Sequence, residues 1–178
     1  MSESSWEHKA RAPTKLNFAL IMCSTSRFED HKAGRTIKDP SSDLIVETLR
    51  KSDKKLVSRV LVADDKEAIR EAIKGALKNK DVDAVLIVGG TGIAPKDVTI
   101  ETVSPLLEKT LPGFGELFRS LSYDKIGSPA IMSRAVAGVN EGKAIFCIPG
   151  SPNAVKLCLD KLILPETGHI VKHAREDS

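Results

Sequence analysis

A short apolar strand that runs directly into a glycine-rich turn constrains this chain more than any other feature. Residues 85–88 read Val-Leu-Ile-Val and are followed at once by Gly89-Gly90-Thr91-Gly92. A short, largely β-branched run of this kind indicates a strand buried on both faces, as in a parallel sheet. Glycine has no Cβ, so it lets the backbone turn sharply and approach a ligand closely. The sequence therefore predicts a buried strand that ends at a candidate ligand-binding turn.

The turn after this strand carries groups that suit a phosphate site. Consecutive backbone N–H groups in a glycine-rich loop cradle an anion, usually a phosphate. Thr91 adds a hydroxyl, Lys96 a cation, and Asp97 a carboxylate that suits a metal ion or orients a substrate. A tight strand-to-helix turn with solvated charges explains the same residues, and from this motif alone the two interpretations have equal weight. The spacing matches neither Gly-x-Gly-x-x-Gly nor the Walker loop.

Length and composition indicate a globular protein of one domain. The chain has 178 residues, of which 41% are hydrophobic and 29% charged, which suits a packed core. The net charge of +3 is too small to predict a nucleic-acid or membrane partner. No apolar run approaches the roughly 20 residues of a membrane span. The first residues lack the apolar segment of a signal peptide, and we expect a cytoplasmic protein.

The cysteines and histidines form no recognisable metal motif. Cys23, Cys147 and Cys158 lie in apolar segments without zinc-type spacing. Free cysteine behaves as a small hydrophobic residue, so buried core thiols are strongly favoured over metal ligands, and a reducing compartment fits. The histidines are scattered, at His8, His31, His169 and His173. A histidine metal site is therefore not favoured.

Strands and helices alternate through the first half of the chain. Strands are expected at residues 16–23, 55–63 and 81–88. Helices with apolar residues at helical spacing are expected after Ser41-Ser42-Asp43 and after Asp65. Residues 28–40 are expected to form a long polar loop. Strands that alternate with helices in this way form right-handed βαβ units and a parallel sheet.

Polar residues follow each of these strands. The run Ser24-Thr25-Ser26-Arg27 follows the first strand, Asp64 and Asp65 follow the second, and the glycine turn follows the third. Open α/β sheets bind ligands at the carboxyl ends of their strands, where these loops converge. This convergence favours a ligand site over a plain turn. One aspartate must cap the next helix. Asp65 suits that role and leaves Asp64 to face the sheet edge, although capping alone is the simpler interpretation.

The second half is expected to contain further helices and one more strand. Helices are expected at 98–109, from Leu111 to Ser122, and from Ser128 through Ala137, with a turn at 138–142 and a polar tail after residue 165. Residues 143–148 indicate a strand that leads into Pro149-Gly150-Ser151. Ser151 is a good N-cap and Pro152 a good first helical residue, so a second anion site is expected at this helix start. Capping explains both residues, but not why two such turns follow two apolar strands.

Taken together, these segments resemble the MoaB/Mog family of molybdenum-cofactor biosynthesis proteins, which also occurs as a domain of gephyrin and its plant counterpart. The matching segments are Gly89-Gly90-Thr91-Gly92 with Asp97-Val98-Thr99, Pro112-Gly113-Phe114-Gly115-Glu116, Ser133-Arg134-Ala135-Val136-Ala137-Gly138 and Pro149-Gly150-Ser151. Each piece is weak alone, and the combination is specific. The match covers about residues 16–165 and looks closest to the MoaB branch.

The resemblance implies a fold and a reaction. The fold is a three-layer α/β/α sandwich with a mostly parallel central sheet, the molybdopterin-binding fold, in a single domain at residues 16–165. We expect a flexible arm at 1–15 and a loose tail at 166–178. The family transfers AMP from ATP to the terminal phosphate of molybdopterin, releases pyrophosphate and requires Mg²⁺. A homotrimer or homohexamer is expected, in which Trp6 of the arm anchors on a neighbouring subunit.

The resemblance also implies the site residues. Asp97 matches the aspartate that is essential in active members, and Asp64 matches a second functional aspartate, so both are expected to be catalytic and to bind Mg²⁺. The nucleotide-phosphate residues implied by the family are Gly89, Gly90, Thr91, Gly92, Gly150 and Ser151. The residues expected to contact substrate, by a looser match or by charge, are Ser24, Ser26, Arg27, Asp39 and Lys96.

Chemistry agrees with these roles. Displacement at an α-phosphate needs charge neutralisation and alignment more than a covalent residue, and Mg²⁺ accepts carboxylate and phosphate oxygens. A rival hypothesis is a non-catalytic, oligomeric molybdopterin-binding protein. A weaker one is a phosphosugar or nucleotide hydrolase on a similar sheet. Because Asp64 and Asp97 are both present, the sequence favours the enzyme.

Overall fold

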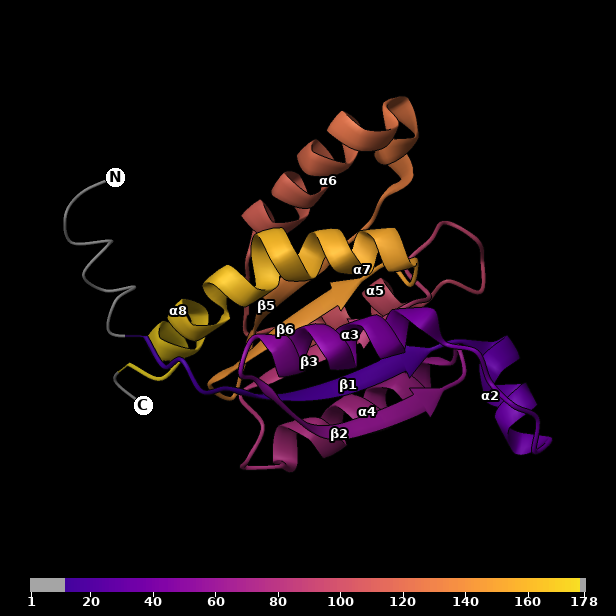
Figure 1. Cartoon of the computed structure of the whole chain (residues 1–178), viewed down its shortest axis with the longest axis horizontal. Coiled ribbons are helices and arrows are strands. Elements are labelled where there is room, and N and C mark those ends of the chain that lie inside the picture. Colours follow the sequence, from indigo (N-terminus) through magenta and orange to yellow (C-terminus); the bar gives the residue numbers. More distant parts are fainter. Residues whose placement is uncertain (1–11, 177–178) are drawn as a thin grey trace.

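A six-stranded sheet in the order β2-β1-β3-β6-β5-β4 forms the middle layer of the molecule (Figure 1). The computed structural model describes residues 12–176, so Trp6 and most of the predicted arm lie outside the described residues. The strands are β1 (Asn17–Cys23), β2 (Lys55–Val62), β3 (Ala84–Val88), β4 (Lys109–Thr110), β5 (Val136–Asn140) and β6 (Lys143–Ile148). β2, β1, β3 and β6 are parallel, whereas β5 and β4 are antiparallel to their neighbours.

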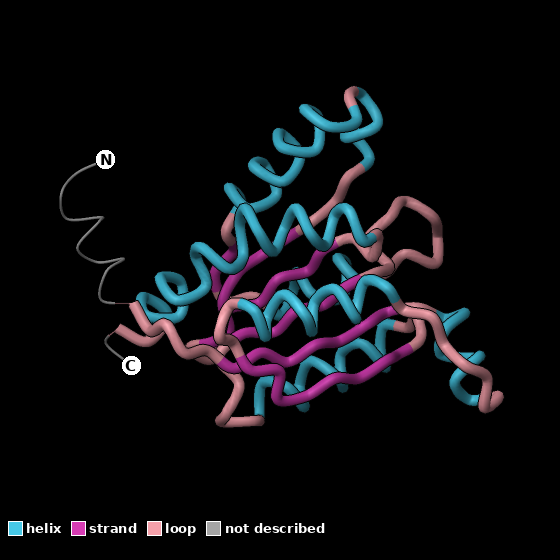
Figure 2. Tube along the Cα trace, in the orientation of Figure 1, coloured by secondary structure: helices cyan, strands magenta, loops and turns pink. Residues whose placement is uncertain are grey.

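Helices cover both faces of this sheet (Figure 2). The α-helices are α2 (Thr25–Lys32), α3 (Pro40–Lys51), α4 (Lys66–Lys78), α5 (Thr99–Val103), α6 (Pro112–Ile126), α7 (Pro152–Cys158) and α8 (Leu164–Ala174). Shorter 3₁₀ segments are η1 (Ser104–Leu106) and η2 (Ser128–Met132), and a π-helical segment is η3 (Leu159–Ile163). The three-layer α/β/α fold with a mostly parallel sheet, predicted from the sequence, is confirmed.

The alternation of side chains along β1 explains the two cores. Phe18, Leu20 and Met22 face one side of the sheet, where α3, α6, α7 and α8 pack. Ala19, Ile21 and Cys23 face the other side, where α4 and α5 pack. Successive strand residues point to opposite faces, so a strand that is apolar throughout must be covered on both. The predicted strands agree with the observed ones, except that the third begins at Ala84.

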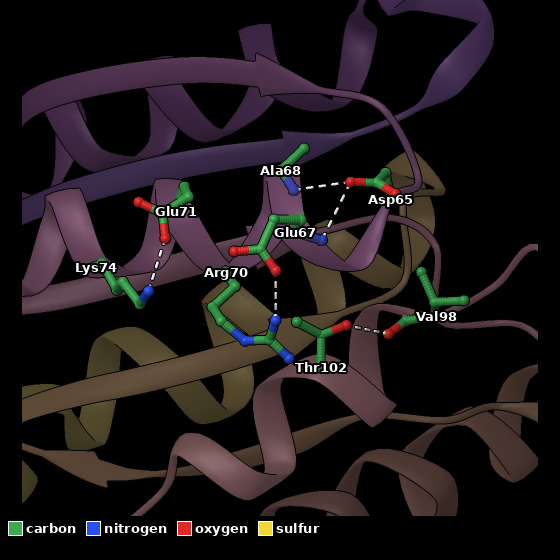
Figure 3. A network of polar contacts seen from close by, with 8 residues as sticks. All are labelled: Asp65, Glu67, Ala68, Arg70, Glu71, Lys74, Val98 and Thr102. Carbon is green, nitrogen blue, oxygen red and sulfur yellow. Dashed lines mark hydrogen bonds and ion pairs between the residues drawn. The ribbon is translucent and has the colours of Figure 1, made fainter.

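Asp65 caps α4, as predicted, and Figure 3 shows how. Its Oδ1 atom accepts hydrogen bonds from the backbone N–H groups of Glu67 and Ala68, at 3.1 and 2.9 Å. The ion pairs Glu67–Arg70 and Glu71–Lys74 lie on the exposed face of the same helix. Because Asp65 satisfies the helix start, Asp64 is available for another role.

The segment between β1 and α3 differs from the prediction of a long polar loop. Residues from Thr25 form α2, because the Ser24 side chain accepts from the backbone N–H of Arg27 and caps a new helix. α3 is capped by Asp39, whose Oδ1 accepts from Ser42 N, and not by Ser41-Ser42-Asp43. The pair Asp39-Pro40 is a cap followed by a proline at the first helical position, a stronger start than the serines.

Two further segments correct the prediction. Residues 128–137 form the short η2 and then β5, not one helix, and Gly138 lies inside β5, not in a turn. A Cβ at Gly138 would overlap the Lys109 carbonyl oxygen, so glycine lets β4 pair closely with β5. The tail after residue 165 is helical through Ala174, because Val171 is buried on the sheet and the Thr167 hydroxyl donates to Ile163 O.

The three cysteines are buried core thiols, as predicted. Burial raises the pKa of Cys23 and of Cys158 to about 12, and it raises the pKa of Cys147 well above its usual value. A thiol that stays protonated is a poor nucleophile and metal ligand. Within residues 12–176, no helix has both the length and the apolar character needed to cross a bilayer.

Candidate functional site

The carboxyl ends of the four parallel strands meet at one edge of the sheet, and hydrogen bonds join them beyond the strands. Ser24 N, after β1, donates to Val62 O at the end of β2 at 2.9 Å. Gly89 N, after β3, donates to Ile148 O at the end of β6 at 3.0 Å. The loops that were predicted from the sequence to lie at one edge therefore start side by side.

Asp64 links the loop after β2 to the loop after β1. Its Oδ2 atom accepts hydrogen bonds from Thr25 N at 2.8 Å and from Thr25 Oγ1 at 3.0 Å. The backbone N–H of Asp64 donates to the same hydroxyl oxygen at 3.0 Å. These three bonds fix one edge of the carboxylate, so that its Oδ1 atom is left to face the glycine turn.

The glycine turn packs directly against these loops. Gly89 and Gly90 have φ angles of +103° and +61°, which favour glycine over any residue with a Cβ. A Cβ at Gly89 would overlap Cys23 O, and one at Gly90 would overlap Thr99 Oγ1 and lie 2.7 Å from Asp64 Oδ1. The turn therefore needs glycine at these positions, because the backbone approaches both the end of β1 and the Asp64 carboxylate.

Asp97 closes the other end of the same turn. Its Oδ2 atom accepts a hydrogen bond from Ala94 N at 2.9 Å, and a Cβ at Gly92 would lie 2.6 Å from that oxygen. Asp97 is half-buried, and the turn continues into α5, whose first residue, Thr99, donates its N–H to Gly90 O. The glycine turn thus has a carboxylate at each end, Asp64 against Gly90 and Asp97 against Gly92.

Arg134 holds the turn from outside, a role that the sequence did not reveal. Its Nε donates to Thr91 O at 3.0 Å, and its terminal nitrogens donate to both carboxylate oxygens of Glu101 at 2.8 and 3.1 Å. The bond to Glu101 raises the pKa of Arg134, and the bond to Arg134 lowers the pKa of Glu101. The only signal in the sequence was the place of Arg134 in the Ser133-Arg134 segment of the family match.

The loop after β6 meets the glycine turn. A Cβ at Gly150 would lie 3.3 Å from Gly89 Cα, so the two loops are in contact. Ser151 caps α7, as predicted, by accepting from Ala154 N at 3.3 Å. Ser41 Oγ, at the start of α3, donates to Gly150 O at 2.6 Å. Loops from β3 and β6 are therefore held together as one wall.

A cleft of about 330 Å³ lies where the two loops meet. Its walls include these residues from the predicted site: Gly89, Gly90, Thr91, Gly92, Asp97 and Gly150. Pro129, Met132, Ser133 and Arg134 form the opposite side. Ser151 lines a neighbouring cavity of about 230 Å³ that shares Ser133 and Pro149 with this cleft. Asp64 reaches the turn at Gly90 without lining the cleft.

The residues expected to contact substrate are spread over the segment between β1 and α3 and the glycine turn. Ser24 caps α2 and its hydroxyl lies 3.3 Å from that of Ser26. Arg27 pairs with Asp39 at 3.7 Å, and the buried Asp39 carboxylate caps α3. Asp39 lines a separate cavity of about 340 Å³ with Met22, His31 and Arg59. Lys96 is exposed on the outer part of the glycine turn. The structure therefore places Lys96 on the glycine turn and Ser24 directly after Cys23, which contacts Gly89, whereas Arg27 and Asp39 pair with each other.

The oxygen atoms at this edge fit a magnesium ion. Mg²⁺ prefers carboxylates, hydroxyls and phosphate oxygens as ligands. The carboxylates of Asp64 and Asp97 flank the turn, and Thr99 Oγ1 lies beside the same glycine as Asp64 Oδ1. Thr99 Oγ1 is buried, and its neighbour in the described part of the chain is the Cys23 thiol, a weak hydrogen-bonding group. A buried hydroxyl of this kind normally has a partner, so an additional ligand at this position would satisfy it.

Comparisons with known proteins agree with this geometry. Residues 19–169 match the family model described as a probable molybdopterin binding domain. Molybdenum cofactor biosynthesis protein B of Bacillus subtilis (strain 168) is 44% identical over 172 residues, which cover 96% of this chain and 97% of that protein. The probable molybdopterin adenylyltransferase of Methanocaldococcus jannaschii is 39% identical over 163 residues, 90% of this chain and 95% of that protein.

A solved structure supports the same relationship. The crystal structure of a molybdenum cofactor biosynthesis protein B superimposes with a TM-score of 0.84 at 44% identity, and the match covers 92% of this chain and 98% of that one. The residues that match the family model, 19–169, include every strand of the sheet except the first two residues of β1. This chain therefore belongs to the probable molybdopterin binding domain family, the MoaB/Mog family that its sequence motifs resemble.

Proposed function

We propose that this chain functions in molybdenum cofactor biosynthesis and transfers AMP from ATP to the terminal phosphate of molybdopterin, with release of pyrophosphate. The relative from Methanocaldococcus jannaschii carries the name of this activity, and the relative from Bacillus subtilis carries the name of the pathway. Each alignment covers at least 90% of this chain and at least 95% of the relative, which supports applying the proposal to the whole domain. A cytoplasmic location is proposed with it, since buried free thiols suit a reducing compartment.

One observation carries the proposal: a single glycine turn has a carboxylate in contact with it at each end. The carboxylates come from the ends of β2 and of the turn itself, and each meets a glycine whose Cβ would collide with it. A plain strand-to-helix turn needs one capping group, and Asp65 and Ser151 already supply the caps of α4 and α7. Asp64 and Asp97 each hold a loop through Oδ2, by accepting from Thr25 and from Ala94. Two carboxylates against one turn are more than capping requires, which supports a role in chemistry.

The chain's own residues suit each part of this reaction. Backbone N–H groups of the glycine turn would donate hydrogen bonds to phosphate oxygens, and Arg134 holds the turn in shape by donating to Thr91 O. Asp64, Asp97 and Thr99 would hold Mg²⁺, which supplies charge neutralisation at the phosphates when bound. Thr25 holds Asp64 in position through its N–H and hydroxyl. Preorganised groups of this kind account for most of the rate enhancement in phosphoryl transfer.

The test is incubation of the chain with ATP, Mg²⁺ and molybdopterin, followed by mass analysis for the adenylated pterin. We expect wild-type protein to form it. Asp97→Asn keeps the size and polarity of the side chain and removes its charge, so turnover should fall by at least about a hundredfold while the melting temperature changes little. Asp65→Asn is the matched control, because asparagine also caps helices and the rate should stay unchanged.

One result would contradict the proposed activity, and another would contradict the proposed role of Asp97. If wild-type protein binds molybdopterin without forming the adenylated product, the chain is the non-catalytic binding protein considered from the sequence. If Asp97→Asn melts early but adenylates at the normal rate, Asp97 is only a structural residue. Asp64→Asn should behave like Asp97→Asn, and the double variant should lose less than the sum of both effects if the two carboxylates serve one ion.

We also propose that the protein is a homotrimer or a homohexamer. The exposed apolar residues of α6 and η2 support this proposal: Leu117, Tyr123, Ile126, Ile131 and Met132. Leu117, on α6, is 56% exposed. Clustered exposed apolar side chains are typical of interfaces. Light scattering should give a multiple of the mass of one chain at micromolar concentration, and a monomer mass would refute the proposal.

A further inference from the structure

Two histidines on α8 face each other at the end of the molecule opposite the glycine turn. His169 and His173 are four residues apart, so they lie on one side of the helix. Figure 1 shows α8 near the amino ends of the parallel strands, whereas the glycine turn follows their carboxyl ends. The two histidines line a cavity of about 450 Å³ with Glu108, Lys109, Leu111 and Val139. The proposed reaction uses none of these residues.

The two rings present the same nitrogen to each other. The Nε2 atoms of His169 and His173 are 2.9 Å apart, with ring centroids at 4.7 Å. The Nδ1 atom of His173 lies 2.6 Å from an oxygen of Glu176, and the Nδ1 atom of His169 lies 3.4 Å from an oxygen of Glu166. Each ring therefore has a carboxylate on its Nδ1 side and the other ring on its Nε2 side.

This arrangement places two lone pairs in contact. An ionised carboxylate only accepts hydrogen bonds, so the tautomers that satisfy Glu176 and Glu166 carry their protons on Nδ1. A neutral imidazole has one N–H, and its other nitrogen is then an acceptor. With both protons on Nδ1, both Nε2 atoms present lone pairs to one another at 2.9 Å. Two acceptors at this distance repel, and a cation between them removes the repulsion.

We propose that His169 and His173 bind a divalent first-row transition ion, with Zn²⁺ as the ion to test, through their Nε2 atoms. Neutral imidazole is a preferred ligand of Zn²⁺, Ni²⁺ and Cu²⁺. Histidine ligands of metals usually donate the other ring N–H to a carboxylate, which is the position of Glu176 and Glu166 here. The side chains of His169 and His173 are 28% and 46% exposed, so a hydrated ion can reach them.

The site is expected to be exchangeable. Among the residues from 12 to 176, no group of three or more histidine, cysteine or acidic side chains is arranged to hold a metal. Glu108 lines the same cavity, but its carboxylate accepts from Glu141 N at 3.2 Å. Water must therefore complete the coordination, and the ion would bridge one turn of α8, from His169 to His173.

The experiment is calorimetric titration of the untagged, chelator-treated full chain with ZnCl₂ alone, at neutral pH. We expect one ion per chain and a rise in melting temperature with zinc. His169→Asn and His173→Asn should each lose the binding, with unchanged far-UV circular dichroism as evidence of folding. His31→Asn is the matched control, because His31 is an exposed histidine on another helix, and it should bind zinc normally. Glu176→Gln should weaken binding by about tenfold, as is typical for loss of a carboxylate behind a ligand.

Two results would overturn the proposal. The first is zinc binding of equal affinity in wild type, His169→Asn and His173→Asn, which would locate the ion elsewhere. The second is no binding by the wild type at millimolar zinc. In that case the ring nitrogens, followed by ¹⁵N NMR, should show a proton shared between the two Nε2 atoms, and the cation that the geometry requires would be a proton.

Discussion

Two glycine-containing turns lie side by side at the ends of β3 and β6, and they are built differently. In the turn after β3, Gly89 and Gly90 have positive φ angles, and side-chain carboxylates lie against the backbone. In the turn after β6, Gly150 has no positive φ, and neutral hydrogen bonds from Ser41 and to Ser151 hold the loop. The first turn has a shape that most residues cannot adopt, whereas the second is an ordinary helix start.

This difference separates functional geometry from helix capping. Capping alone accounts for Ser151 and Pro152, as the sequence already indicated. It does not account for two carboxylates on one turn. Strained backbone is retained where the surrounding structure requires it, and such sites are often functional. The turn after β3 is therefore the centre of the proposed site, and the turn after β6 is its support.

The largest expected effect is on stability and distinguishes the two turns directly. Gly89→Ala places a Cβ on the Cys23 carbonyl oxygen at a φ of +103°, and a backbone atom cannot move aside easily. We expect a loss of about 3 kcal/mol in the free energy of unfolding, from backbone strain and overlap together. Gly150→Ala, with its nearest contact at 3.3 Å, should stay within about 1 kcal/mol of wild type. Urea denaturation of both variants measures the difference, and equal losses would mean that the turns do not differ in strain.

The second prediction concerns the side chain that holds the first turn from outside. Arg134→Ala removes the donor to Thr91 O and the fork on Glu101, so we expect a loss of about 1–2 kcal/mol and a lower adenylation rate. Arg134→Lys keeps the charge but not the planar fork, and should recover little of the rate. Thermal unfolding and the adenylation assay measure the two effects. Full recovery by lysine would show that only the positive charge matters, and not the fixed shape of the turn.

The same contrast shows how far the sequence could predict the structure. The strands β1, β2, β3 and β6 were predictable, because each is rich in apolar residues and is followed by polar or small residues. The caps Asp65 and Ser151 were predictable, because they precede helices with regular apolar spacing. These features depend on local sequence, which determines propensity and periodicity.

The missed features depend on partners far away in the chain. β5 was predicted as helix and turn, because its apolar pattern is short and Gly138 is explained only by its contact with β4. α8 was predicted as a loose tail, although Val171 packs against the core. Arg134 could not be singled out, because its two partners, Thr91 and Glu101, are 43 and 33 residues away. Ser24 and Asp39, which were predicted to contact substrate, have capping roles that a polar loop would not require.

The third prediction tests whether the second turn is more than a helix start. Ser151→Ala removes the bond to Ala154 N and should cost about 1 kcal/mol, because the bond is long at 3.3 Å and the helix is short. Ser151→Asp restores a cap and should recover the stability, but it places a negative charge where a nucleotide phosphate is proposed. ATP binding by calorimetry and melting temperature are measured on both variants. Normal ATP binding by Ser151→Asp would leave Ser151 with a capping role only.

The smallest expected effect is a pH dependence confined to the first turn. The hydrogen bond from Arg134 lowers the pKa of Glu101 in the folded state below the value of about 4.3 in the unfolded chain. A lowered folded pKa means that the pair stabilises the fold fully above about pH 4.3, and that this contribution is lost as the pH falls through the folded pKa. Glu101 is 46% exposed, so solvent screening should keep the effect below about 1 kcal/mol.

Glu101→Gln measures that contribution, because glutamine does not titrate and the pair with Arg134 loses its charge. We expect the variant to melt below the wild type at pH 7 and the two melting temperatures to converge as the pH falls through the folded pKa of Glu101. Glu71→Gln is the control. The pKa of Glu71 is lowered by Lys74 in the same way, but that pair lies on the open surface of α4 and should change the melting temperature little.

The turn after β6 has no charged pair of this kind in its described hydrogen bonds, since Ser41 and Ser151 are neutral. A gap between wild type and Glu101→Gln that stays constant from pH 7 to pH 3 would therefore mean that shape alone, and not charge, holds the turn after β3.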